Sequence, residues 1–240
     1  MATEGWQDFG QKVDLTARIR EILLNYPEGT SILKEIVQNA DDARATCIKF
    51  CLDCRHHGTG SLLAPAMAAF QGPALLAFND GVFSDRDLES ISRIGDSKKK
   101  EEEGKTGRFG VGFNSCYHLT DLPSFVSGRY LIIFDPHCRH LPNISSTNPG
   151  KRIDFIQYGD VATVYADQVA PYTGAFGCTL GAGGAGQKGP WPGTLFRFPL
   201  RSAELAEAST ISKQVYTVDS IRTLLEQLAA ESFQILLFLK

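Results

Sequence analysis

The sequence predicts a fold that combines α-helices with a β-sheet, and three observations support this class. Apolar residues recur at helical spacing near the start of the chain, at 15–26 and 32–43. Short apolar or alternating runs bounded by turn residues fill the middle, which is typical of strands. A helical pattern returns from Val218 onward. The length of 240 residues suits one large domain, or one domain with an appendage.

The individual elements follow from these patterns in chain order. Asp14 is a suitable N-cap for the first helix, and Thr30 or Ser31 for the second. The C-terminal helix either docks on this domain's own sheet or packs on a following domain, and periodicity favours neither. Helices are expected at 15–26, 32–43, 85–94, 114–119 and from 218, and strands at 45–53, 74–78, 123–126, 129–135, 152–158, 178–180 and 194–200.

Charge and hydropathy exclude several classes of partner. The formal net charge is −3, whereas a nucleic-acid-binding domain is expected to carry a basic face. No apolar run is long enough to cross a membrane. The N-terminal text MATEGWQDFG has no signal-peptide core. We therefore expect a cytoplasmic protein with no nucleic-acid or membrane partner.

Cysteine and histidine residues raise the question of a metal site. Cys51 and Cys54 have C-x-x-C spacing, but no second ligand pair follows at zinc-finger spacing. Cys138 and His140 could contribute only if folding brought them to other ligands. His137 is isolated in the sequence and is interpreted as a structural or surface residue. We expect free thiols rather than a cysteine-bound metal.

The predicted helix at 32–43 carries an unusual row of polar side chains beside its apolar stripe. Glu35, Asn39 and Asp42 are three or four residues apart, so they lie on one helix surface. The amide oxygen of Asn39 is a suitable ligand for magnesium, and Glu35, one turn earlier, is placed to activate a water. The alternative interpretation is an ordinary solvated helix face.

The segment Gly104–Ser115, with the text GKTGRFGVGFNS, is rich in glycine. Glycines before a helix let backbone N–H groups approach phosphate oxygens closely. The spacing matches neither the Walker pattern nor the dinucleotide-binding pattern. A phosphate-binding loop and a purely structural glycine turn therefore both remain open.

A charge run precedes this loop. The segment Gly95–Thr106 contains three lysines followed by three glutamates, with glycine at one end and beyond the other. Such a run is typical of a solvated loop. It is also consistent with a lid over bound nucleotide, since lids have few buried contacts and glycine near their ends.

Four motifs occur in an order that resembles one ATPase superfamily. They are E-x-x-x-N-x-x-D-A at 35–43, N-D-G at 79–81, G-x-x-G-x-G-F at 107–113, and Gly-Thr at 193–194. That superfamily includes gyrase, the ninety-kilodalton heat-shock chaperone, histidine kinases and MutL. The loop text GRFGVGFNS looks most like the chaperone branch. The longer stretches YPEGTSILKEIVQNADDA and FNDGVFSDRDLESISRIGDSKK are similar to the repeats of the sacsin family.

The resemblance implies an α+β fold of two layers, a mixed or antiparallel sheet with helices on one face, known as the Bergerat-type ATP-binding fold. It implies a chaperone-type ATP-binding domain over 1–210 and a helical extension over 211–240. The implied activity is a chaperone-like ATPase module that binds ATP or ADP with Mg²⁺. The implied partners are client proteins or other domains of the same chain, with a co-chaperone link to the seventy-kilodalton heat-shock system.

Carried over residue by residue, the resemblance also assigns roles. Glu35 matches the catalytic base that activates water, and Asn39 matches the magnesium ligand. The adenine side is assigned Asp42, Ala43, Asn79, Asp80, Gly81 and Thr194, and the phosphate side Lys98, Gly107, Gly110, Val111, Gly112 and Phe113.

One motif departs from the family pattern. Where the pattern is D-x-G-x-G, this chain has Asn79 and Phe83 at the first and last positions. A neutral amide accepts a weaker hydrogen bond than a carboxylate, so a loss of about 1–1.5 kcal/mol is expected unless Asp80 replaces it. Phe83 is bulky enough to crowd the base pocket. Slow hydrolysis is therefore expected even with nucleotide bound, since in the chaperone family an arginine from a following domain completes the site. The alternative to this ATPase module is a chaperone-like scaffold or protein-interaction module that binds no nucleotide.

Overall fold

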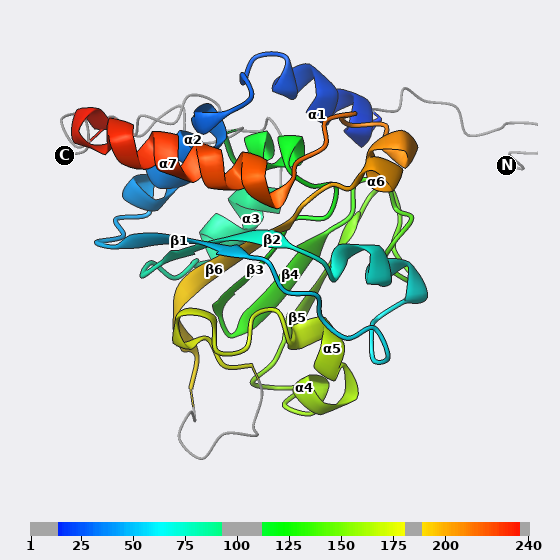
Figure 1. Ribbon diagram of the computed structural model, residues 1–240. Helices are drawn as coiled ribbons and strands as arrows, with labels where there is room; N and C mark the ends of the chain where they lie inside the picture. Colours follow the sequence, from blue (N-terminus) through cyan, green and yellow to red (C-terminus); the bar gives the residue numbers. More distant parts are fainter. Residues whose placement is uncertain (1–13, 93–111, 181–188, 236–240) are drawn as a thin grey trace, which may run out of the picture.

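The computed structural model describes residues 14–92, 112–180 and 189–235 and shows one open sheet with helices packed against it (Figure 1). The sheet has six strands in the order β1-β2-β6-β3-β4-β5. Every neighbouring pair is antiparallel. The predicted α+β class is confirmed, and the sheet is antiparallel rather than mixed.

The elements have the following bounds in chain order. The strands are β1 (Ile48–Asp53), β2 (Ala74–Asn79), β3 (Ser124–Gly128), β4 (Tyr130–Phe134), β5 (Gly150–Asp154) and β6 (Trp191–Pro199). The α-helices are α1 (Leu15–Leu23), α2 (Thr30–Asp42), α3 (Asp85–Ser92), α4 (Val161–Val164), α5 (Ala166–Val169), α6 (Ala203–Ala208) and α7 (Val218–Ile235). Short 3-10 helices are η1 (Pro65–Phe70), η3 (Gly112–His118) and η4 (Ala175–Gly177).

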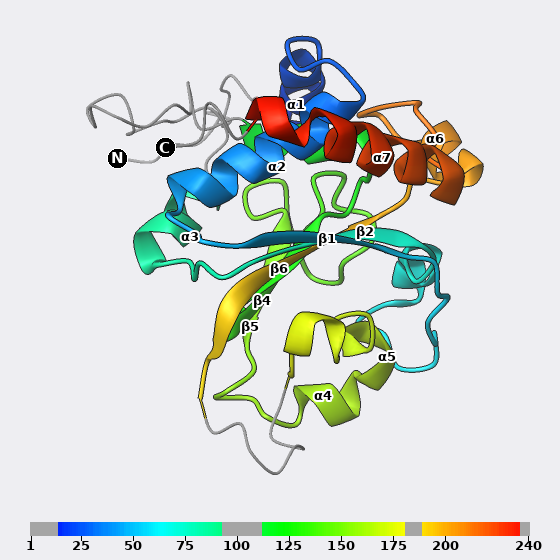
Figure 2. The same ribbon diagram turned by 60° about the vertical axis from the view of Figure 1, so that its left-hand side comes forward.

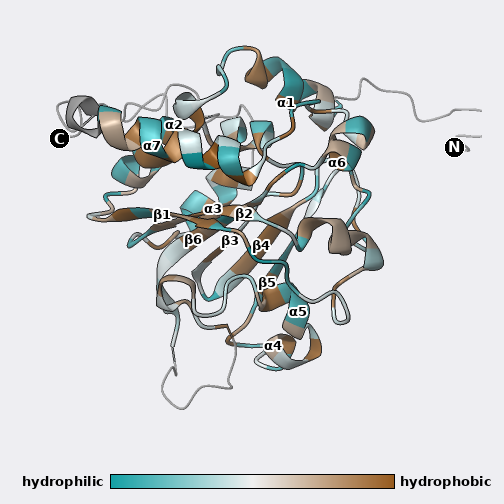
Figure 3. Cartoon of the chain, viewed as in Figure 1, coloured by the Kyte–Doolittle hydropathy of each residue, from teal (hydrophilic) through white to brown (hydrophobic). Residues whose placement is uncertain are grey.

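Helices lie on both faces of the sheet, which differs from the expected arrangement with helices on one face. The helices α1, α2, α3 and α7 lie on one side, and the short helices α4 and α5 lie on the other (Figures 1 and 2). The central strands require cover on both sides, because Leu75 and Leu76 are both buried although they point to opposite faces. They belong to two separate apolar clusters. Figure 3 shows the central strands as largely hydrophobic.

Helix α2 lies above the sheet, and its apolar stripe faces inward as predicted. Ile32, Leu33, Ile36 and Ala40 are buried along it. The predicted N-cap is wrong, because the helix begins at Thr30 after Gly29 and no side chain caps it. Gly29 has a φ of 93°, a left-handed conformation that glycine adopts without steric strain. The first helix does start as predicted, with the Asp14 carboxylate accepting hydrogen bonds from the backbone of its first turn.

Helix α7 packs on α2 and β1 and contributes to the same apolar core. Ile221 and Leu228 are buried there. Lys34 of α2 forms an ion pair with Glu231 of α7 at 2.6 Å. Of the two arrangements left open for the C-terminal helix, this is docking on the domain itself. In the parts of the chain that the structure describes, no helix has the length and apolar character that a membrane span requires.

Two segments fold differently from their sequence prediction. Residues 178–180 form no strand, and the strand expected at 152–158 ends at Asp154. The chain then turns into α4 and α5, which the sequence did not predict. Val161 and Val169 of these helices are buried in the second apolar cluster. Helices this short have little periodicity of their own, so their formation depends on packing.

A buried ion pair joins the end of β6 to η3. Arg201 is fully buried, and its guanidinium binds both carboxylate oxygens of Asp121 at 2.7 and 3.2 Å. It also donates to the backbone carbonyls of Tyr117 and His118, each at 2.7 Å. Ser209, just after α6, donates to Asp121 at 2.9 Å. This network fixes the C-terminal end of η3 relative to β6 and α6.

We expect Arg201→Ala to destabilise the protein by about 3–5 kcal/mol, because the substitution leaves the Asp121 carboxylate buried without its partner. The measurement is the free energy of unfolding in urea. Arg222→Ala is the matched control, since Arg222 pairs with Asp219 on the exposed surface of α7 and surface pairs contribute little. Equal effects of the two substitutions would contradict this account.

Candidate functional site

The structure brings the polar row of α2 into contact with the end of the glycine-rich segment. Gly112, the first residue of η3, lies directly beside Glu35. A Cβ atom at Gly112 would be 2.2 Å from Oε2 of Glu35 and 3.9 Å from Oδ1 of Asn39. A side chain at residue 112 would therefore displace the Glu35 carboxylate. The contact explains why this position is glycine.

Glu35 is half-buried, and its carboxyl has a raised pKa. Burial is the main cause, and the negative charge of Asp42 is the second. A carboxylate with a raised pKa is closer to the range in which a general base operates at neutral pH. The catalytic role of Glu35 stays a prediction.

A cavity of about 110 Å³ lies between α2, α3 and the sheet. Four predicted site residues line it: Asn39, Asp42 and Ala43 from α2, and Phe113 from η3. The other lining residues are Ile36, Phe83, Asp87, Ser90, Ile91, Phe196 and Phe198. Pockets for drug-sized ligands are typically roughly 300–1,000 Å³. The cavity is therefore smaller than a typical pocket for a drug-sized ligand.

The turn after β2 is held by hydrogen bonds to the neighbouring strands. Oδ1 of Asn79 is buried and accepts from the backbone N–H of Gly81 at 3.0 Å. Thr194 of β6 is paired with Asn79 in the sheet and donates its hydroxyl to the Gly81 carbonyl at 2.8 Å. Ser127 of β3 bonds to the Thr194 hydroxyl at 2.8 Å and accepts from the Phe83 N–H at 2.9 Å. The sequence did not identify Ser127, because its neighbours are set by strand order.

Asp80 is the predicted site residue that the structure places elsewhere. Its carboxylate accepts hydrogen bonds from the backbone N–H groups of Thr46 and Cys47 at 2.8 and 3.0 Å. The Thr46 hydroxyl also bonds to it and is the main cause of the lowered pKa of Asp80. The carboxylate therefore fixes the start of β1 and does not line the cavity. It is not positioned to replace the aspartate that Asn79 lacks.

Phe83 forms part of the cavity wall. Its ring packs against Phe125 and Phe196, with centroids 5.1 and 6.1 Å away. A glycine at this position, as in the family pattern, would leave that space open. The aromatic ring thus reduces the room on the side of the cavity nearest the sheet.

Residues 12–240 match the family model of the sacsin domain. The chain belongs to this family. It is 39% identical to human sacsin over 237 residues, which is 97% of this chain and 5% of sacsin. The chain therefore corresponds to a small segment of a much larger relative, and the resemblance to sacsin repeats is confirmed.

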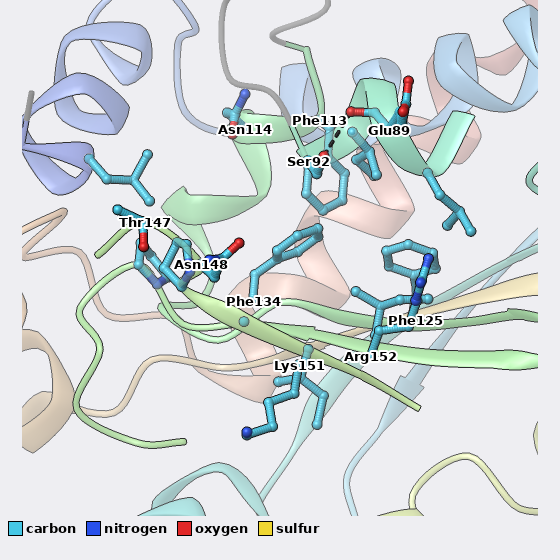
Figure 4. A pocket seen from close by; sticks show the side chains of 18 of the residues that line it. Glu89, Ser92, Phe113, Asn114, Phe125, Phe134, Thr147, Asn148, Lys151 and Arg152 are labelled. Carbon is cyan, nitrogen blue, oxygen red and sulfur yellow. Dashed lines mark hydrogen bonds between the residues drawn. The ribbon is translucent and has the colours of Figure 1, made fainter. Parts of the chain in front are cut away.

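The sacsin domain has a second, larger hollow on the same face of the sheet (Figure 4). Its volume is about 1,110 Å³, and it shares Ile91 and Phe113 with the smaller cavity. Figure 4 shows the rings of Phe113 and Phe134 close together in it, with centroids 5.9 Å apart. The two hollows therefore adjoin each other at Ile91 and Phe113.

Several predicted site residues of the sacsin domain lie outside the described residues. These are Lys98, Gly107, Gly110 and Val111, together with the segment 95–106 interpreted as a lid. Their roles stay predictions. The described part of the site is the α2 row, Ala43, Gly112 and Phe113. The hydrogen-bonded group of Asn79, Gly81 and Thr194 lies next to it but does not line the small cavity.

We expect Glu35→Gln to stabilise the protein increasingly as the pH rises. A carboxyl whose pKa is raised on folding opposes folding once it ionises, so this cost is absent at about pH 4 and present at about pH 7. Glutamine keeps the shape and cannot ionise. The measurement is the difference in unfolding free energy between variant and parent at the two pH values.

Glu207→Gln is the control for this prediction, because Glu207 is exposed on α6. Its difference from the parent should not change with pH in the same direction. A pH-independent effect of Glu35→Gln would mean that the Glu35 carboxyl is not perturbed as described.

Proposed function

We propose that this sacsin domain binds ATP or ADP with Mg²⁺ beside α2, as a chaperone-like ATPase module of a larger protein. The observation that supports this most directly is the contact between Gly112 and the pair Glu35 and Asn39. The three residues in this contact are those to which the family resemblance assigns the catalytic base, the magnesium ligand and part of the phosphate loop. The small cavity is lined by residues of four elements, α2, α3, η3 and β6.

The chemistry of the residues is consistent with this role. Asn39 offers an amide oxygen to the magnesium ion that accompanies the nucleotide. Glu35, with its raised pKa, is the group that would activate the attacking water. The base would enter the cavity between α2 and the sheet, near Asp42, Ala43 and the Asn79 turn.

Binding is expected to be weak and hydrolysis slow. Asn79 offers a neutral acceptor, and its oxygen already accepts from Gly81. Asp80 is held at Thr46 and does not restore the charge. The nucleotide would then regulate folding or assembly of client proteins or neighbouring domains, with the seventy-kilodalton heat-shock system as a co-chaperone partner.

We expect millimolar Mg-ATP or Mg-ADP to raise the thermal unfolding temperature of the chain, because a ligand that binds only the folded state stabilises it. The gain is about 2.7 kcal/mol at a hundredfold excess over Kd. Asn39→Ala should abolish the shift, whereas Asn25→Ala, at an exposed asparagine after α1, should retain it. No shift in the parent at any accessible concentration would refute nucleotide binding.

Phe83 favours a second candidate, a scaffold that keeps the fold for contacts with clients or other domains without binding nucleotide. Its ring narrows the cavity through its contacts with Phe125 and Phe196. In this case Glu35, Asn39 and Asp42 would be retained with the fold but would bind no nucleotide. The two candidates differ in whether the parent chain responds to nucleotide.

We expect Phe83→Ala to increase nucleotide affinity, since it removes the ring from the cavity wall while leaving the α2 row intact. The measurement is the Mg-ADP affinity of parent and variant by calorimetry. Val82→Ala is the control, because Val82 is exposed and does not line the cavity. An unchanged or reduced affinity would show that Phe83 does not limit access.

A further inference from the structure

Three side chains with metal-binding atoms gather just after β4. They are Asp135, His137 and His140, within the text DPHCRH. One donor atom from each lies within 4.8 Å of the others. This group is separate from the site beside α2. The sequence did not reveal it, since His137 was interpreted as isolated and no regular element sets its position relative to His140.

A tight turn brings these side chains together. The N–H of Cys138 donates to the carbonyl of Asp135 at 2.9 Å, and Pro136 occupies the second position of the turn, where it is favoured. Cys138 has a φ of 53°, which reverses the chain direction. His140 is thereby returned to the side of Asp135 and His137.

Asp135 has an unpartnered oxygen in a buried position. Asp135 is fully buried, and its Oδ2 accepts hydrogen bonds from the backbone N–H groups of His140 and Leu141 at 2.7 and 2.9 Å. Oδ1 has no hydrogen-bond partner among the described residues, and neither does the buried Nδ1 of His137. Leaving buried polar atoms unpaired is costly. Both atoms belong to residues of the cluster, which is therefore short of polar partners for its buried groups.

We propose that Asp135, His137 and His140 bind a zinc ion. Two imidazole nitrogens and one carboxylate oxygen are a donor set suited to zinc, and three protein ligands leave one coordination position for water. Magnesium is a poor candidate because it prefers an all-oxygen shell. The ion would link the two ends of the turn after β4, where Asp135 and His140 lie.

The surroundings hold two of the ligands in place. The two backbone N–H groups on Oδ2 fix the Asp135 carboxylate so that Oδ1 is available. The ring of His140 packs edge-on against Phe70, with centroids 4.8 Å apart. Tetrahedral zinc with bonds of about 2.0–2.1 Å needs donors about 3.3 Å apart. The donor atoms lie within 4.8 Å of one another, so they must move closer to reach that spacing, and the two histidine rings are only partly buried.

Zinc binding has a specific consequence for the proton on His137. The N–H of Thr210 donates to Nε2 of His137 at 3.1 Å, so the neutral ring carries its proton on Nδ1. A zinc ion at Nδ1 requires that proton to leave and another to bind Nε2, with no net release. The Thr210 bond then breaks, and because Thr210 is exposed its N–H is free to bind water.

The first test is a calorimetric titration of the complete chain with Zn²⁺. Cys51→Ser with Cys54→Ser serves as the background, because both thiols are exposed and could bind zinc themselves. We expect one zinc ion per chain in this background. Either His137→Gln or His140→Gln should weaken binding by more than about 100-fold, since even residues that only hydrogen-bond to a metal ligand contribute about 10–100-fold.

The matched control is His56→Gln at an exposed histidine remote in sequence from the cluster, which should bind zinc as the background does. Mg²⁺ in place of Zn²⁺ should give no binding at the cluster. Absence of zinc binding in the background, or binding unaffected by both cluster substitutions in folded variants, would overturn the proposal.

A second measurement needs no substitution in the cluster. Nitrogen-15 NMR of the histidine rings distinguishes a proton on Nδ1 from one on Nε2. In the background chain we expect saturating Zn²⁺ to move the His137 proton from Nδ1 to Nε2, while His118, buried at Tyr26, keeps its signals. Unchanged His137 signals at saturating zinc would overturn the proposal even if zinc bound elsewhere on the chain.

Discussion

The buried pair of Arg201 and Asp121 is the constraint on which the functional face depends. It lies where the end of β6, η3 and the segment after α6 meet, and Arg201 also binds the backbone carbonyls that end η3. Because η3 begins at Gly112, the same network anchors the helix that carries the glycine beside Glu35. An ion pair with no access to water is costly to separate, so this geometry is held firmly.

The site itself depends on the close approach of the Gly112 backbone to Glu35 rather than on many hydrogen bonds. The absence of a side chain at Gly112 lets the Glu35 carboxylate sit against the backbone, and Asp42 in the same row opposes its ionisation. On the opposite side, Ser127 of β3 and Thr194 of β6 form hydrogen bonds to the turn after β2, and the Phe83 ring that follows this turn lines the cavity. The wall formed by α2 is polar, whereas the aromatic wall at Phe83 limits the space. The ATPase proposal and the scaffold alternative differ in whether the space left beside Phe83 admits a nucleotide.

The sequence predicted individual helices and strands better than the contacts between them. The stripe of α2, the Asp14 cap and most strands follow from periodicity, and the spacing of Glu35, Asn39 and Asp42 places them on one helix surface without any tertiary information. Periodicity did not predict the cap of α2, the helices α4 and α5, or the helical cover on the second face of the sheet. A short segment has no periodicity to detect, and a glycine cap leaves no side-chain signal. Asp80 matched a motif in sequence, yet its carboxylate binds the start of β1.

By itself, the sequence determined the fold class, the family and the order of the motifs, because each depends on residues that are neighbours along the chain. Only the tertiary structure decided that Gly112 contacts Glu35, that Phe83 faces the cavity and that Asp135, His137 and His140 converge. These contacts depend on strand order, turn direction and side-chain packing. Such long-range geometry is set by the burial of both faces of the sheet, which no local pattern in the sequence encodes.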